Sequence, residues 1–452
     1  MARKIGSKNK NQSEVHSGIL LELLGVNGEM EKKDLINVVP SVKYLERVMT
    51  NLRKDGLVKD HNKDGIRCIR LTEKGKEILQ VRNPERYAQF SYPDSEVVKR
   101  KRDLLISKTH VLMHGAGVQI YTDIKPDIFG GVTPPLADKA VPLSQANSLA
   151  LNLGKQPALN PNPNIGSSPP SPENPPLEGK GVKKGKTGLE DNAPLCTLSQ
   201  TFLSPVTIMR PSFYTSKEYK RGEWRKKGGG DPQSVMSSRS MGVLLTPSTV
   251  YNVYNTGDSL IEWDVSVERR FKAEVEKSLC GDLLPHLYHR VSAEGAGGIL
   301  IGKDMMTLER YLFEVKEKPK ASESKFLMDM YRSLYFISND PCGAGQLKFA
   351  SRPDLYNSLI EVVKNSYSPP SKTYAMTNDA ITEDDRPVLF AIIPDIPRMV
   401  RFWQGLEETK KKGLVVCLRP QLEFFDRYFG GMAEIMHLDY FDKIKRMYLD
   451  GR

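Results

Sequence analysis

Residues 17–81 show apolar periodicities that predict three helices followed by a two-stranded hairpin. An apolar run over 19–24 predicts the first helix, and a second, short helix follows it. The third helix, SVKYLERVMTNLRKDG, begins after Pro40 with Ser41 as its predicted N-cap. Apolar residues recur on one face of this helix at Val42, Leu45, Val48, Met49 and Leu52.

The opposite face of the third helix is polar and cationic. It carries Lys43, Tyr44, Arg47, Asn51 and Lys54. Cations of this kind contact phosphates, while Arg and Asn can hydrogen-bond to base edges in a major groove. The face therefore predicts contact with DNA. Two alternatives stay open, a charged face that is only solvated and a helix that contacts only protein.

A basic hairpin is predicted directly after the third helix. Residues 57–59 form its first strand, residues 61–65 its turn and residues 66–71 an alternating return strand. The segment LTEKGKEIL then closes the unit, with Thr72 as a predicted helix cap.

The hairpin adds cations to the predicted DNA-binding surface. Its turn offers His61 and Lys63, and the polar face of its return strand offers Arg67. Such residues can reach a phosphate backbone or a minor groove. The whole arrangement resembles the winged helix-turn-helix domains of bacterial DNA-binding proteins.

Composition sets the expected boundaries along the chain. Fourteen of the 30 prolines lie between Pro126 and Pro205, where too little apolar area is available to offset the entropy of ordering. The predicted parts are a disordered basic tail over 1–14, a winged helix over 15–82, a connector helix within 95–125, a disordered proline-rich segment over 126–208 and a further domain over 210–447. In the connector, Lys99, Arg100, Lys101 and Arg102 form a cluster for which phosphate contact and a solvated face are equal alternatives.

Beyond residue 210, strand-like runs alternate with amphipathic helices, a pattern typical of an α/β sheet with helices on its faces. The predicted fold class is thus an α+β winged helix, a disordered proline-rich insertion and a carboxy-terminal α/β domain with a mixed sheet. Strands are predicted at 241–245, 250–254, 297–302, 332–338, 346–350, 387–395 and 414–420, with a short strand after Gly257. Helices are predicted at 265–279, 305–317, 353–365 and 396–412.

The charge balance favours a polyanionic partner. The chain has 452 residues, and 66 Lys and Arg against 55 Asp and Glu give a net charge of +11. No apolar run reaches membrane-spanning length and the amino terminus lacks the apolar core of a secretory signal, so a cytoplasmic protein without a membrane partner is predicted. The five cysteines form no CxxC pair, which argues against a zinc site or a disulfide framework.

Three patterns in the sequence suggest catalytic or phosphate-binding chemistry. Gly297 to Lys303 fits GxxxxGK, but Asp304 replaces the Ser or Thr that would bind magnesium, and a carboxylate there repels phosphate. Asp304 with Glu314 and Lys316 has the spacing of a metal-dependent nuclease, although helical periodicity places the latter two on a solvent face. The pair in His286-Leu287-Tyr288-His289 is spaced one residue too widely for a relaxase metal site. No cofactor is predicted, apart from a divalent metal if the nuclease hypothesis holds.

The order of a winged helix, a basic connector and an α/β domain with VYNTGDSLIEW and PVLFAIIPDIPRMVRFWQGL resembles replication-relaxation proteins of plasmids and conjugative elements. The resemblance implies a restriction-endonuclease-like fold and a role in plasmid mobilisation or replication control. It implies double-stranded DNA as a partner, with conjugation or replication proteins and a homodimer as further candidates. GGILIGKDMMTLE departs from the acidic motif of active members and puts cleavage in doubt. An active relaxase or nuclease and a transcriptional repressor with a ligand-sensing or dimerising domain remain alternatives.

Overall fold

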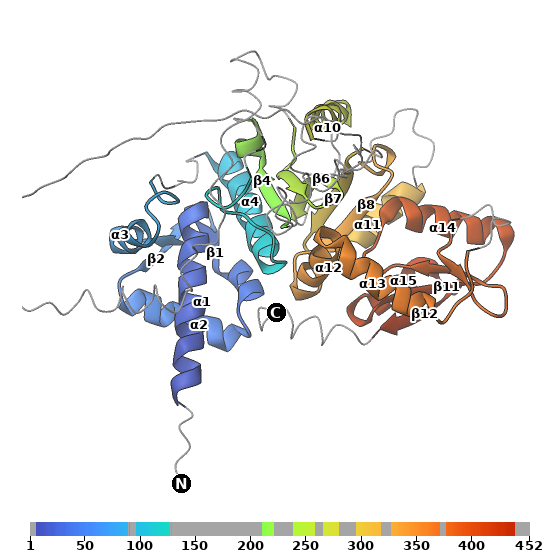
Figure 1. Cartoon of the computed structure of the whole chain (residues 1–452), viewed down its shortest axis with the longest axis horizontal. Helices are drawn as coiled ribbons and strands as arrows, with labels where there is room; N and C mark the ends of the chain where they lie inside the picture. The colour runs from blue at the N-terminus through green and yellow to red at the C-terminus, as the bar shows by residue number, and fades with distance from the viewer. Residues whose placement is uncertain are drawn as a thin grey trace, which may run out of the picture. The chain divides into compact units, whose positions relative to one another are not determined.

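The computed structural model (Figure 1) describes most of the chain outside its proline-rich middle. The residues described are 6–88, 90, 96–126, 128, 210–220, 238–257, 265–279, 295–317, 327–370 and 377–438, without the side chains of 6–13 and 314–317. They belong to one compact unit. The predicted disordered segment, apart from Pro126 and Ile128, the strand after Gly257 and the stretch His286 to His289 lie outside them.

The amino-terminal region, residues 6–88, combines helices with a small antiparallel sheet of order β1-β3-β2. Ser41 caps α2 as predicted, because its Oγ accepts a hydrogen bond from the Tyr44 amide at 3.3 Å, and Thr72 caps α3 in the same way. The elements are α1 (Gly6–Asn27), β1 (Met30–Glu31), the 3₁₀ helix η1 (Lys32–Val38), α2 (Val42–Lys54), β2 (Val58–Lys63), β3 (Ile66–Leu71) and α3 (Glu73–Arg82).

Three details of this region differ from the sequence-based expectation. The disordered tail predicted over 1–14 is too long, because α1 begins at Gly6. The polar residues before the apolar run contain no proline, so the helix can extend through them. The hairpin turn is also shorter than predicted, since β2 continues to Lys63 and only Asp64 and Gly65 turn. Both have positive φ, 56° and 74°, as a tight Asp-Gly turn requires. The strand β1 was missed because two residues carry no periodicity.

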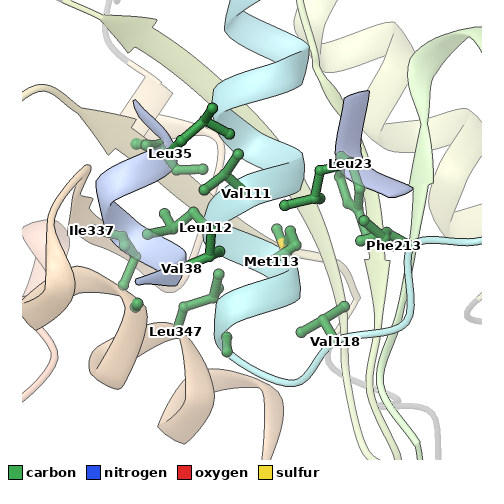
Figure 2. Packing of buried hydrophobic residues seen from close by; sticks show 14 of the residues in the cluster. Leu23, Leu35, Val38, Val111, Leu112, Met113, Val118, Phe213, Ile337 and Leu347 are labelled. Carbon is green, nitrogen blue, oxygen red and sulfur yellow. The ribbon is translucent and has the colours of Figure 1, made fainter. Parts of the chain in front are cut away.

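The predicted connector helix is present as α4 (Val97–Gly115). Figure 2 shows how it packs: Val111, Leu112 and Met113 lie among apolar side chains from several elements. Leu35 and Val38 of η1 contribute to the same buried cluster, as do residues from the carboxy-terminal half of the chain. α4 is therefore a shared core element rather than a tether.

The carboxy-terminal half is mixed α/β, as predicted, but it has two sheets instead of one. The first has the order β4-β5-β6-β7-β8 and is antiparallel up to β6 and parallel beyond it. The second has the order β12-β11-β10-β9, with β10, β11 and β12 parallel. The strands are β4 (Ser212–Thr215), β5 (Gly242–Leu245), β6 (Val250–Gly257), β7 (Gly297–Gly302), β8 (Leu334–Ser338), β9 (Ala380–Ile381), β10 (Pro387–Phe390), β11 (Gly413–Leu418) and β12 (Ala433–Leu438).

The composition of a strand does not show which other strand it pairs with. A single sheet was therefore predicted where the structure has two. The segment after β10 meets the edge of β8 through one antiparallel bridge, Tyr335 with Asp395, instead of continuing the ladder. The helices are α10 (Val265–Leu279), α11 (Met305–Glu317), η2 (Leu327–Asp329), α12 (Pro341–Ser351), α13 (Pro353–Lys364), α14 (Ile396–Thr409), η3 (Arg419–Gln421) and α15 (Leu422–Phe429).

The strand predicted at 346–350 is wrong, because these residues belong to α12. Asp340 caps this helix by accepting from the Gly343 amide at 2.8 Å, and Pro341 occupies its first turn. These start signals outweigh the apolar alternation that suggested a strand. Gly343 also allows α12 to approach β8 closely, since an added Cβ would lie 1.7 Å from the Ser338 carbonyl oxygen.

A buried ion cluster joins α4 to the hairpin. The Glu29 carboxylate accepts hydrogen bonds from Arg100 Nε at 2.8 Å and from Arg70 Nε at 2.6 Å. Burial alone would raise the pKa of Glu29, but hydrogen bonds from Cys68, Arg100 and Arg70 hold that pKa below its ordinary value. Arg100 Nη1 also donates to the Lys63 carbonyl at 2.6 Å, so one guanidinium ties the carboxylate to the end of β2.

The cluster corrects the expectation for the connector cations. Neither phosphate contact nor a solvated face fits Arg100, whose side chain is only 1% exposed. Arg102 is half-buried and donates to the Ser238 carbonyl at 2.9 Å. Lys99 and Lys101 alone among the four are exposed. α4 is packed on several sides, so Arg100 and Arg102 fall on faces of the helix that other elements cover.

We predict that Arg100→Met destabilises the fold strongly, because it leaves Glu29 buried with one fewer partner. Removing one partner of a buried pair costs roughly 3–5 kcal/mol. The matched control is Lys99→Met, since Lys99 is exposed and pairs with Glu96 across one helical turn. Urea unfolding measures both variants, and equal losses would contradict the role assigned to the cluster.

A second prediction concerns Asp34 on η1, which lies 3.9 Å from Lys108 of α4. Burial raises the pKa of Asp34 to about 6, against the opposing effect of Lys108. The unfolded chain ionises this carboxyl near pH 4, so its ionisation opposes folding progressively as the pH rises from about 4 to about 6. Asp34→Asn should remove that dependence and gain roughly 3 kcal/mol relative to the wild type across this window.

The measurement for Asp34 is the free energy of unfolding of both proteins at pH 4, 5, 6 and 7. Asp55→Asn, at an exposed carboxylate, serves as the control. Parallel curves for the wild type and Asp34→Asn would show that this carboxyl does not titrate as proposed.

Candidate nucleic-acid interface

α2 presents a continuous cationic stripe to solvent. Its buried face is formed by Leu45, Val48, Met49 and Leu52, as expected, whereas Val42 in the first turn is 55% exposed. On the opposite side four exposed polar residues follow one another at helical spacing: Lys43, Arg47, Asn51 and Lys54. Glu46 is the single carboxylate of the helix, and Lys32 pairs with it.

Tyr44 was expected on this contact surface, but it is half-buried and supports a neighbour instead. Its hydroxyl lies 3.1 Å from His16 Nδ1, and the two rings meet edge to face. The Arg47 guanidinium lies over the Tyr44 ring, 5.0 Å from its centre. A cation over a ring is attracted by the negative ring face, so Tyr44 restricts where Arg47 can point.

The register of the hairpin sorts its side chains onto two faces. Asp60 and Asn62 of β2 share one face with their partners Ile69 and Arg67 of β3, because directly paired residues lie on the same side. Asp60 accepts from Arg53 of α2 at 2.6 Å, which fixes this face toward α2. Asn62 and Arg67, both exposed, lie on this same face of the hairpin, closer to the turn.

His61 and Lys63 lie on the other face of the hairpin, so the surface predicted from the sequence divides in two. His61 Nδ1 is 3.3 Å from the Glu29 carboxylate, and the side chain is half-buried. Burial lowers the pKa of His61, and the charge of Arg70 lowers it further. The expectation that His61 sits at the turn is wrong, because β2 extends past it. Lys63 remains exposed at the end of the strand.

Asn62 is the interface candidate that the sequence analysis missed. Counting in steps of two back from the Asp64-Gly65 turn would have placed it beside Arg67. The five-residue turn predicted from the sequence includes Asn62, so it does not reveal the pairing of Asn62 with Arg67.

The candidate catalytic residues have structural roles or positions in regular elements. Asp304 caps α11, since its Oδ1 accepts from the Thr307 amide at 3.0 Å. Glu314 and Lys316 belong to α11 and not to a strand beside Asp304, and their side chains lie outside the described residues. Gly297–Gly302 form β7, which is a strand and not a phosphate-binding loop.

Metal binding, thiol chemistry and membrane insertion are the remaining candidates in the described residues. Among the described residues, no group of three His, Cys, Asp or Glu could hold a metal ion. Cys68, Cys342 and Cys417 are buried free thiols. No described helix has the length and apolarity needed to cross a bilayer.

Comparison with known proteins identifies no relative of this chain. No protein-family model, no curated protein and no solved structure matches the chain. The features that bear on function are therefore the exposed stripe of α2 and the hairpin face that turns toward this helix.

Proposed function

We propose that residues 15–82 are a winged helix-turn-helix domain that binds double-stranded DNA, with α2 as the recognition helix and β2–β3 as the wing. One observation carries the proposal: Lys43, Arg47, Asn51 and Lys54 form an exposed row on α2, and Arg67 lies on the hairpin face turned toward the same helix. A helix of this chemistry fits a major groove.

The position of each residue supports a distinct role. Arg47 and Asn51 lie in the middle of α2, and their side chains can form paired hydrogen bonds to guanine and adenine edges. Lys43 and Lys54, near the two ends of the helix, suit flanking phosphates. Asn62 and Arg67 on the hairpin suit the neighbouring backbone or minor groove.

We further propose a role on a mobile genetic element, in plasmid mobilisation or replication control, in the cytoplasm. Support comes from the sequence resemblance to replication-relaxation proteins together with the mixed α/β architecture that follows the amino-terminal region. In this role the α/β half would associate with a second copy or with conjugation or replication proteins rather than cleave DNA, because Glu314 and Lys316 belong to a helix and not to a strand beside Asp304.

The test is fluorescence anisotropy with duplex DNA from the protein's own locus, at rising salt. Arg47→Ala should weaken binding by about 1–3 kcal/mol and relax sequence preference, because a base contact is lost. Lys54→Gln should weaken binding to all sequences similarly and reduce the salt slope by about one. Lys277→Gln, an exposed lysine of α10, is the control. Absence of binding at low salt would end the proposal.

The contact between Tyr44 and Arg47 gives a second prediction. Tyr44→Phe keeps the ring under Arg47 and removes the hydroxyl contact with His16, so sequence preference should survive. Tyr44→Ala removes the ring, and its effect should not add to that of Arg47→Ala in a double-mutant cycle. Additive effects would mean that Tyr44 acts on DNA directly, or on stability, and does not position Arg47.

A further inference from the structure

The exposed face of α2 is broader than its cationic stripe. A second row lies beside the stripe and consists of Val42, Glu46 and Thr50, which follow one another at four-residue spacing and are all exposed. Each of them directly precedes a residue of the stripe in the chain. Residues four apart on a helix differ by only about 40° around its axis, so the second row stays on one side of the stripe.

The polar groups of the second row have partners within the protein. The Thr50 hydroxyl donates to the Glu46 carbonyl at 2.8 Å. The Glu46 carboxylate pairs with Lys32 of η1. The remaining groups of the row are methyls, those of Val42, which is 55% exposed, and that of Thr50. The row thus offers a ligand apolar contact in addition to charge.

The position of Val42 brings it to the end of the helix that matters for base contact. Ser41 caps α2, so Val42 is its first residue. Among the described residues, the apolar cluster around α2 does not include Val42. The amino-terminal residues of a recognition helix are those that approach base edges in the major groove. An exposed valine there can meet a base without any rearrangement of the core.

The major groove of DNA displays one kind of apolar group, the 5-methyl of thymine. The other bases present hydrogen-bond donors and acceptors in that groove. An aliphatic methyl group recognises the thymine methyl by contact, because the contact removes apolar surface of both groups from water. The second row has this chemistry, and the stripe beside it has the donors and acceptors that suit guanine and adenine.

We propose that Val42 and Thr50 contact thymine 5-methyl groups, so that the chain selects sites in which thymines accompany the bases read by Arg47 and Asn51. This inference rests on the proposed function and names a base that the same surface reads. Val42 is the principal specificity-determining residue in it, because its whole side chain is apolar. Cytosine methylated at C5 carries the same methyl group, and the experiment distinguishes it from thymine.

Replacing thymine by uracil tests the contact, since this change removes the methyl and nothing else. In a duplex from the protein's own locus, with each thymine replaced in turn, uracil at the contacted position should weaken wild-type binding about fourfold, as for one buried methyl. Val42→Ala should bind the thymine duplex about fourfold more weakly and lose the response to uracil at that position. Val81→Ala, at an exposed valine of α3, is the matched control and should keep the full response.

A pair of variants tests Thr50. Thr50→Ser removes the methyl and keeps the hydroxyl, whereas Thr50→Val keeps the methyl and removes the hydroxyl. Thr50→Ser should bind about fourfold more weakly than Thr50→Val and lose the response to uracil at a second thymine. The opposite order would show that the hydroxyl contacts DNA, and it would overturn the assignment of Thr50.

The outcomes separate this inference from the proposed function. Absence of binding at low salt overturns both. If Arg47→Ala weakens binding but uracil affects the wild type and Val42→Ala equally, DNA binding stands and the contact between Val42 and thymine is overturned. A response that depends on Val42 only in duplexes with 5-methylcytosine would overturn the assignment to thymine.

Discussion

The arrangement of the amino-terminal region depends on the ion pairs between the buried Glu29 carboxylate and two arginines. A carboxylate removed from water is tolerated only when donors replace its hydration, and here Arg70 and Arg100 supply them from two different elements. Arg100 belongs to α4 and Arg70 to the hairpin. If the two elements separated, the Glu29 carboxylate would lose a donor while it remained buried. The orientation of the hairpin relative to α4 follows from this requirement.

The same helix connects this ion cluster with the sheets. Asn255 of β6 donates to Thr109 Oγ1 at 3.0 Å, one side of α4 packs on η1, and apolar residues of β8 and α12 join the same cluster. α4 thus has polar contacts toward β6 and toward the hairpin, with an apolar core between them (Figure 2). The amino-terminal region and the first sheet share a core, so a change at the hairpin is resisted by packing in both.

Much of this could be read from the sequence, and the failures have physical causes. Strong helical periodicity and caps at Ser41 and Thr72 identified α2 and α3, since local signals decide such elements. The burial of Arg100 could not be predicted, because its partner Glu29 is 71 residues away in the chain. The division into two sheets likewise depends on long-range pairing, and the face on which His61 lies depends on a turn shorter by three residues than the five that were assumed.

Charge counts overstate the surface available to a polyanion. A cation contributes fully to DNA binding only while its charge is hydrated and uncommitted, so that phosphate can replace water and counterions. Arg53, Arg70, Arg100 and Arg102 are all close to the proposed interface in sequence, but each is engaged with a carboxylate or a carbonyl of the fold. The lysines and arginines that extend from α2 and from the hairpin face beside it remain exposed. The arginines nearest the core thus orient the surface, and the outer cations define its chemistry.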